Sequence, residues 1–150
     1  MKAVIQRVSK SSVTIKGQQH ANIGTGILIL LGIIDEDTIE DIKWLTHKIA
    51  NLRIFPDNNE VMNRSLIDVD GDVIVVSQFT LHANTRKGNR PSYIKAAKPD
   101  VAIPLYKAFI ANLESILRKT VQCGEFGADM KVELLNDGPV TIIIDTKNKE

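Results

Sequence analysis

The sequence has little cysteine and no long apolar run, and both absences narrow the class of protein. Its single cysteine, Cys123, cannot form a disulfide within the chain, which is typical of a reducing compartment. The longest apolar stretch, residues 27–34, is far shorter than the ~20 residues of a membrane-spanning helix. The opening MKAVIQRVSK lacks the apolar core of a secretory signal. We therefore expect a cytoplasmic protein without membrane contact.

The sequence also lacks a charge excess and any standard cofactor signature. Nineteen Lys and Arg against eighteen Asp and Glu leave a net charge of +1, so contact with a polyanion would depend on local clustering. The three histidines, at positions 20, 47 and 82, are scattered without metal-ligand spacing. No G-x-S-x-G, phosphate-loop or dinucleotide motif occurs. We expect neither a metal nor a cofactor.

What the sequence does contain predicts one globular domain, residues 1–150. The chain is 43% hydrophobic and 25% charged, and 150 residues are enough to surround a single core. Apolar residues recur at helical spacing over about 38–52 and again over about 100–119. Asp37 followed by Glu40 resembles a capping box at the start of the first helix.

Runs rich in β-branched residues predict strands over 2–15, 27–34 and 73–79. Residues 132–134 and 140–144 read as two further strands, and the turn-forming residues between them predict a hairpin. We predict an α/β fold: a strand-rich sheet or partly closed β-barrel with two main covering helices. The order of the strands is left open.

Three segments are candidates for a functional site. In the first, an apolar strand ends in the polar side chains of Ser77, Gln78 and Thr80, interrupted by Phe79. Polar groups at a strand end are well placed to face a ligand, although they also commonly bond to neighbouring loops. The second segment is 136–141 (NDGPVT), where Asp-Gly alone would explain a tight turn and Gly-Pro presents rigid backbone carbonyls.

The third candidate is the loop 84–98, which loses all periodicity. Its basic residues, with no acid among them, are Arg86, Lys87, Arg90, Lys95 and Lys98. Such a cluster can neutralise phosphates, and Tyr93 could stack on a base. A solvated surface is the plain alternative.

Taken together, these segments resemble the D-aminoacyl-tRNA deacylase family. The matching stretches are MKAVIQRV (1–8), NLRIF (51–55), VSQFTL (76–81), TRKGNRPSY (85–93), GEFGADM (124–130) and NDGPVT (136–141). They cover almost the whole chain in the family's order, and neither signature motif, SQFTL or NDGPVT, departs from its pattern.

The resemblance implies the family's fold and a homodimer with active sites at the subunit interface. Gly138 and Pro139, joined by a cis peptide bond, would enter the partner's pocket beside its residues 77–80. Arg7 and Met130 match positions that fix or flank this motif and the pocket. The substrate would be D-aminoacyl-tRNA, and we expect Arg86, Lys87 and Arg90 to bind its RNA.

The resemblance also implies how the enzyme would select and cleave its substrate. Rigid carbonyls would exclude an L side chain, so glycine, which has none, should also be accepted. Thr80 is the obvious nucleophile but needs a base, and His82 would share its face only if the strand continued. The resemblance instead implies catalysis by the substrate's own 2′-hydroxyl, with an oxyanion hole from backbone amides near Phe79 and Thr80.

Two other functions remain compatible with the residues. One is a non-catalytic nucleic-acid-binding homodimer that uses the basic loop. The other is a peptidase or thioesterase with a threonine nucleophile.

Overall fold

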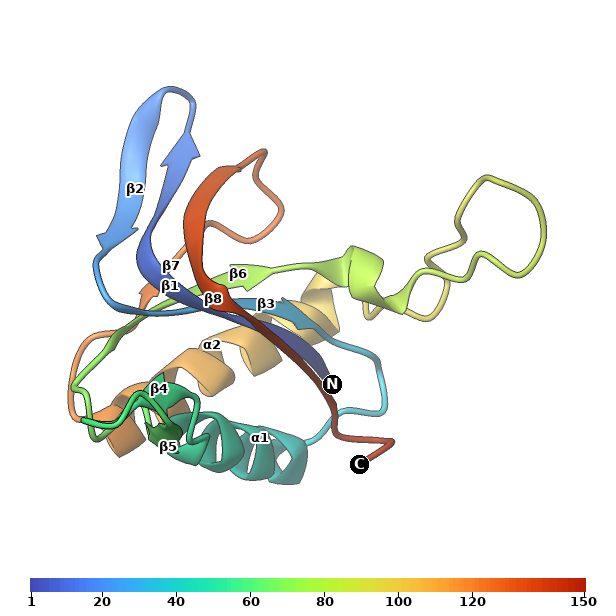
Figure 1. The fold of residues 1–150 in the computed structure, drawn as a ribbon. Coiled ribbons are helices and arrows are strands. Elements are labelled where there is room, and N and C mark those ends of the chain that lie inside the picture. The colour runs from blue at the N-terminus through green and yellow to red at the C-terminus, as the bar shows by residue number, and fades with distance from the viewer.

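The computed structural model describes residues 1–150 as a strongly curved, six-stranded mixed sheet with two helices on one face (Figure 1). The strands run in the order β2-β1-β3-β6-β7, and β8 pairs with the other edge of β1. Their bounds are β1 Lys2–Ile15, β2 Gln18–Ile23, β3 Gly26–Gly32, β6 Asp72–Ser77, β7 Gln122–Cys123 and β8 Lys131–Asp145. A small second sheet pairs β4 (Phe55–Pro56) with β5 (Met62–Arg64).

Strand β1 organises the sheet because it is long enough to serve several partners. Its first half pairs with β3, its second half pairs with β2, and its opposite edge pairs with β8 over nearly its full length. The turn between β1 and β2 is made by Lys16 and Gly17, both at positive φ. Strand β3 then runs parallel to β6 at the centre of the sheet.

The helices α1 (Ile39–Asn51) and α2 (Pro99–Leu117) lie side by side under the sheet (Figure 1). Their apolar faces pack with the inward side chains of β1 and β3 in the main core, where Leu45, Phe109 and Ile29 are fully buried. A smaller cluster, which includes Val8, Val13 and Val76, occupies the opposite face of the sheet. The curvature of β1, β2 and β8 around this second cluster produces a nearly closed, barrel-like sheet.

The predicted hairpin near the C-terminus is wrong. Residues 131–135 and 141–145 belong to one strand, β8, and both pair antiparallel with β1. Residues 137–140 interrupt this ladder opposite Arg7, between the pairs Gln6–Thr141 and Val8–Asn136, and do not reverse the chain. Local turn residues predicted a hairpin, but the long β1 edge offers hydrogen bonds to both halves, and pairing with it prevails.

The predicted capping box is displaced by one residue. Thr38 is the N-cap of α1, and the Asp41 carboxylate accepts hydrogen bonds from the Thr38 amide at 2.8 Å and the Thr38 hydroxyl at 3.1 Å. Asp37 is instead buried, where it forms an ion pair with the α-ammonium group of Met1 and accepts a hydrogen bond from the Ile34 amide. The Met1 ammonium also donates to Thr146 Oγ1 at 2.9 Å.

This buried ion pair makes Asp37 a sensitive position for stability. Removing one partner of such a pair leaves an uncompensated charge, and we expect Asp37→Asn to lower the free energy of unfolding by about 3–5 kcal/mol. Asp35→Asn, on an exposed neighbour, should change it by less than about 0.5 kcal/mol. Urea denaturation of both variants measures the difference, and equal midpoints would contradict the assignment.

Candidate active site

The first candidate segment begins where β6 ends. Ser77 is the last paired residue, opposite Leu31, and the Gln78 amide donates to the Leu31 carbonyl at 2.7 Å. The predicted strand 73–79 is therefore two residues too long, because residues 79–82 form a 3₁₀ turn, η1 (Phe79–His82). As the first two amides of this turn, those of Phe79 and Thr80 have no intrahelical acceptor and donate to no other protein group.

The Thr80 hydroxyl has an amide as its neighbour and not a base. Gln78 Nε2 donates a short hydrogen bond to Thr80 Oγ1. His82 lies two residues further along a helix with three residues per turn, about 240° around its axis. The Thr80–His82 pair that a continued strand would have allowed is therefore not formed. His82 is buried, and burial lowers the pKa of its imidazole.

The second candidate segment is held by Arg7. This guanidinium is only 8% exposed; its Nε donates to the Asp137 carbonyl at 2.8 Å and its Nη1 to the Ile54 carbonyl at 2.6 Å. The Asp137 carboxylate lies 3.7 Å from Arg7 Nε. Arg7 thus ties the interruption in β8 to the chain that follows α1. The sequence indicated Arg7, but its partner Ile54 contributes only a backbone carbonyl, which leaves no signal in the sequence.

Gly138 occupies a position that no other residue fits. The Gly138–Pro139 peptide is cis, and Gly138 has φ +136°. A Cβ atom there would lie 2.8 Å from Val140 Cγ2 and 2.9 Å from Arg7 Nη2. Asn136 supports the segment from the other side, since its Oδ1 accepts from the Val140 amide at 2.9 Å. The result is an exposed, braced pair, Gly138 and Pro139, at the surface of the sheet.

Met130 lies at the start of β8 and packs against the second core cluster. Its sulfur covers Gly124 so closely that a Cβ atom at that glycine would overlap it. Gly124 therefore allows the Met130 side chain to lie flat beside β7.

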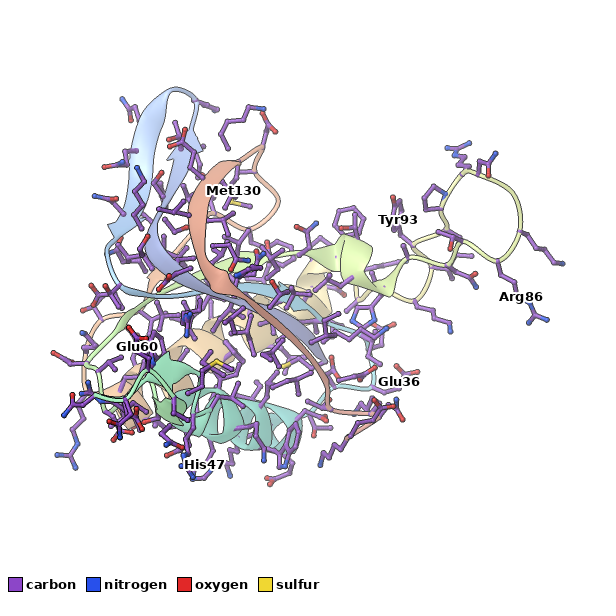
Figure 2. The ribbon with its side chains drawn as sticks, viewed as in Figure 1. Glu36, His47, Glu60, Arg86, Tyr93 and Met130 are labelled. Carbon is purple, nitrogen blue, oxygen red and sulfur yellow. The ribbon has the colours of Figure 1, made fainter.

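The third candidate segment projects far from the sheet as a loop after η1, and Figure 2 shows Arg86 and Tyr93 on it.

The loop carries its charges in full contact with solvent. Arg86, Lys87 and Arg90 are all exposed. At the root of the loop, Phe79 and Tyr93 form an edge-to-face pair with ring centroids 5.0 Å apart, and both rings are partly exposed. The first candidate segment and the basic loop are therefore joined through an aromatic contact.

The two motifs lie apart within one chain. Ser77 is connected through Leu31 of β3 to Ala3 of β1, whereas Gly138 lies beside Arg7 of β1. The path through the sheet covers about four residues along the strands and three strand spacings across, roughly 13 Å and 14 Å. A single subunit thus presents two halves at separate places.

No group of three or more His, Cys, Asp and Glu side chains is arranged to hold a metal ion. The absence of a cofactor stays a prediction. No helix of the chain has the length and apolar character needed to cross a membrane.

Comparison with known proteins identifies the family. The family model for D-Tyr-tRNA(Tyr) deacylase matches residues 4–145. Curated proteins named D-aminoacyl-tRNA deacylase from Flavobacterium johnsoniae and Flavobacterium psychrophilum are 65% and 67% identical over 150 residues, covering 100% of both chains in each case. The corresponding protein of Parabacteroides distasonis is 65% identical over the same length.

Two solved structures share the fold of this chain. The structure of the c-Myc DNA Unwinding Element Binding Protein is 41% identical, covers 97% of this chain and 98% of its own, and superimposes with a TM-score of 0.92. A probable eukaryotic D-amino acid tRNA deacylase has the same fold, with a TM-score of 0.82 at 17% identity and coverage of 95% and 97%.

The fold and the comparisons first define a class: the protein is an enzyme, a hydrolase of the tRNA deacylase type. More narrowly, the chain belongs to the D-Tyr-tRNA(Tyr) deacylase family. The expectation that the SQFTL and NDGPVT motifs raised is confirmed at this level.

Proposed function

We propose that this chain hydrolyses the ester bond of D-aminoacyl-tRNA, releasing the D-amino acid and free tRNA. The observation that carries the proposal is the pair of unengaged amides of Phe79 and Thr80 at the end of β6. Ester hydrolysis passes through a tetrahedral oxyanion, and adjacent N–H donors that are free to bond to it stabilise the charge that develops there. Family membership supplies the ester that would be held against them.

The geometry favours a hydroxyl group of the substrate, and not the side chain of Thr80, as the group that starts the attack on the ester. A threonine hydroxyl attacks only when a base accepts its proton, and the Gln78 amide beside it is not basic. His82 lies on a different side of η1. The 2′-hydroxyl of the terminal ribose, adjacent to the 3′-ester, is positioned by covalent geometry and can assist attack without a protein base.

The separation of the two motifs supports a homodimeric active site. In this arrangement Gly138 and Pro139 of one subunit reach residues 77–80 of the other. Strand β8 pairs only with β1, so its other edge is open over many residues. Its exposed side chains include Ile143, 72% exposed, and Leu135, 53% exposed. An open edge with apolar side chains favours association with a second copy.

Chiral selection would then follow from rejection of the L side chain. Arg7 holds the Asp137 carbonyl before Gly138, and Asn136 holds the Val140 amide after Pro139, so this main chain gives way less easily than a flexible side chain would. A thousandfold preference for one enantiomer requires about 4 kcal/mol, which steric exclusion can supply. A site that only excludes has no means of rejecting glycine.

The test is a series of tRNAs charged with D-alanine, glycine or L-alanine. We expect the first two to be hydrolysed at similar rates and L-alanyl-tRNA to be at least about a thousandfold slower. Hydrolysis of D-alanyl-tRNA with glycyl-tRNA as resistant as L-alanyl-tRNA would contradict selection by exclusion. Failure to hydrolyse any of the three would contradict the proposed activity.

A nucleic-acid-binding role is the second candidate, favoured by the exposed basic loop and by the name of the relative that binds a DNA unwinding element. A protein of this kind would retard tRNA in a gel and leave the ester intact. Rapid cleavage of simple activated esters without RNA would instead favour a threonine peptidase or thioesterase.

A further inference from the structure

A hollow lies at the root of the projecting loop, next to the end of η1. Its volume is about 510 Å³. The residues that line it are Lys2, His82, Ala83, Asn84, Thr85, Arg86 and Lys95. Three of these side chains are cations and none is a carboxylate. The lining comes from β1, η1 and both arms of the loop, so only the folded chain assembles it.

The walls of this pocket are ordered by local hydrogen bonds. Asn84 and Ser92 exchange two backbone hydrogen bonds of 2.8 and 2.9 Å, which close the loop at its root. Asn84 Oδ1 also accepts from the Arg86 amide at 2.9 Å. These bonds hold the main chain of 84–86 in place although its side chains are exposed.

Two features of the pocket are unexplained by the fold alone. His82 is 7% exposed, and its Nε2 atom is buried without a hydrogen-bond partner. Arg86 and Lys95 take part in none of the ion pairs of the structure, while Lys2 lies 3.9 Å from Asp145 Oδ2. Cations gathered without counter-charge repel one another, so this pocket is suited to receive an anion.

The balance of charged residues around the pocket changes on the side beyond Lys2. The adjoining hollow, which shares Lys2, His82 and Lys95, is also lined by Lys147 and by three carboxylates, those of Asp35, Glu36 and Asp145, which balance its cations. On the opposite side a third hollow, formed by Asn84, Arg86, Lys87 and Ser92, continues the basic surface. An anionic chain that enters along the loop would therefore stop at Lys2, where carboxylates begin.

The position of the basic pocket relative to residues 77–80 indicates which phosphate of the substrate it can bind. Thr80 and His82 are two residues apart, at most ~7 Å along the chain. In the substrate, a single ribose carries both the 3′-ester and the 5′-phosphate of the terminal nucleotide. An ester held at the Phe79 and Thr80 amides therefore brings that phosphate within the span of one nucleoside, and the basic pocket lies in this range.

We propose that this pocket binds the 5′-phosphate of the acylated terminal nucleotide of tRNA. The inference rests on the proposed function, since it assumes the ester is held at residues 77–80. Arg86 and Lys95 supply the charge, Lys2 closes the far end, and the His82 ring lies within the wall. The phosphate contact would orient the ribose for attack on its own ester.

The probes are stable substrate analogues: 3′-(D-alanylamido)-3′-deoxyadenosine and the same compound with a 5′-phosphate. We expect calorimetry to show the phosphorylated analogue binding about ten- to a hundredfold tighter, the range typical of hydrogen bonds to a charged group. The double variant Arg86→Ala/Lys95→Ala, with both changes on exposed side chains, should lose most of this advantage and bind the unphosphorylated analogue as the unmodified enzyme does. Lys107→Ala, an exposed lysine on α2, is the matched control and should keep the full advantage.

The outcomes separate this proposal from the proposed function. Equal binding of the two analogues, binding of neither, or an advantage that survives the double variant would overturn the phosphate site, even if D-alanyl-tRNA is hydrolysed. Inorganic phosphate that binds as tightly as the nucleotide would also overturn it, since the pocket would then recognise free phosphate. A phosphate advantage that the double variant abolishes, in a protein that leaves D-alanyl-tRNA intact, would support the pocket and refute the hydrolase.

Discussion

Replacing the terminal ribose 2′-hydroxyl by hydrogen should slow hydrolysis of 3′-D-alanyl-tRNA by about 10⁴-fold, whereas Thr80→Ala should change kcat/KM by less than about fivefold. The asymmetry follows from the site geometry. Thr80 Oγ1 accepts a hydrogen bond from an amide and has no base, while its backbone amide, which the substitution retains, is free to donate. The 2′-hydroxyl of the substrate lies next to the ester, and no side chain of residues 77–80 can take its role there.

Single-turnover rates with matched deoxy and ribo substrates measure the first effect, and steady-state kinetics of Thr80→Ala and Thr80→Ser measure the second. A control with the deoxy substrate should show unchanged binding, because the loss concerns the chemical step. If Thr80→Ala removed activity and Thr80→Ser restored it, while the deoxy substrate reacted normally, threonine would be the nucleophile.

Gly138→Ala should lower kcat/KM for D-alanyl-tRNA by about a thousandfold. The new methyl group would meet Val140 Cγ2 and Arg7 Nη2 at under 3 Å, and the φ of +136° is one that alanine rarely adopts. A displacement of about 1 Å in a positioning group can cost about a hundredfold. Backbone strain of 1–3 kcal/mol depopulates the native loop by about tenfold or more in addition. Gly127→Ala, at a positive φ in an open loop, is the matched control for the strain alone.

Mixing two inactive variants tests whether the halves come from different subunits. Phe79→Pro removes one of the two free amides, at a first helical position where proline is tolerated. In mixed dimers of Gly138→Ala and Phe79→Pro subunits, one of the two sites would have both intact halves, so about a quarter of the original activity should return. No recovery after demonstrated subunit exchange would show that both motifs act within one chain.

Much of the fold could be predicted because local sequence patterns indicate most of its helices and strands. The helical periodicity of 38–52 and 100–119 corresponds to α1 and α2 within two residues at each end. The errors occurred where a distant partner decides the outcome. Asp-Gly at 137–138 favours a turn locally, but the β1 edge, more than a hundred residues away, extends the chain into one strand.

The site was predictable only as separate motifs. Resemblance to a family indicated residues 77–80, Arg7 and the Gly138–Pro139 pair and implied that they meet between subunits. Their separation within one subunit follows only from the pairing of the strands. His82 was considered as a metal ligand and, if the strand continued, as a base for Thr80, but no pattern indicated the 3₁₀ turn η1 that buries it. Nothing in the sequence singled out Lys2, because only the position of β1 in the folded chain brings it to the basic pocket.

The pairing of β1 with β8 determines when the sheet can be completed during folding. Lys2 lies opposite Asp145, so β1 acquires this neighbour only when β8, more than a hundred residues later in the sequence, is available. Contacts this distant in sequence close slowly, because the entropy of a large loop must be overcome first. Until residues 131–145 pair with it, this edge of β1 is open to foreign strands, and a folding intermediate that lacks β8 is expected to be prone to aggregation.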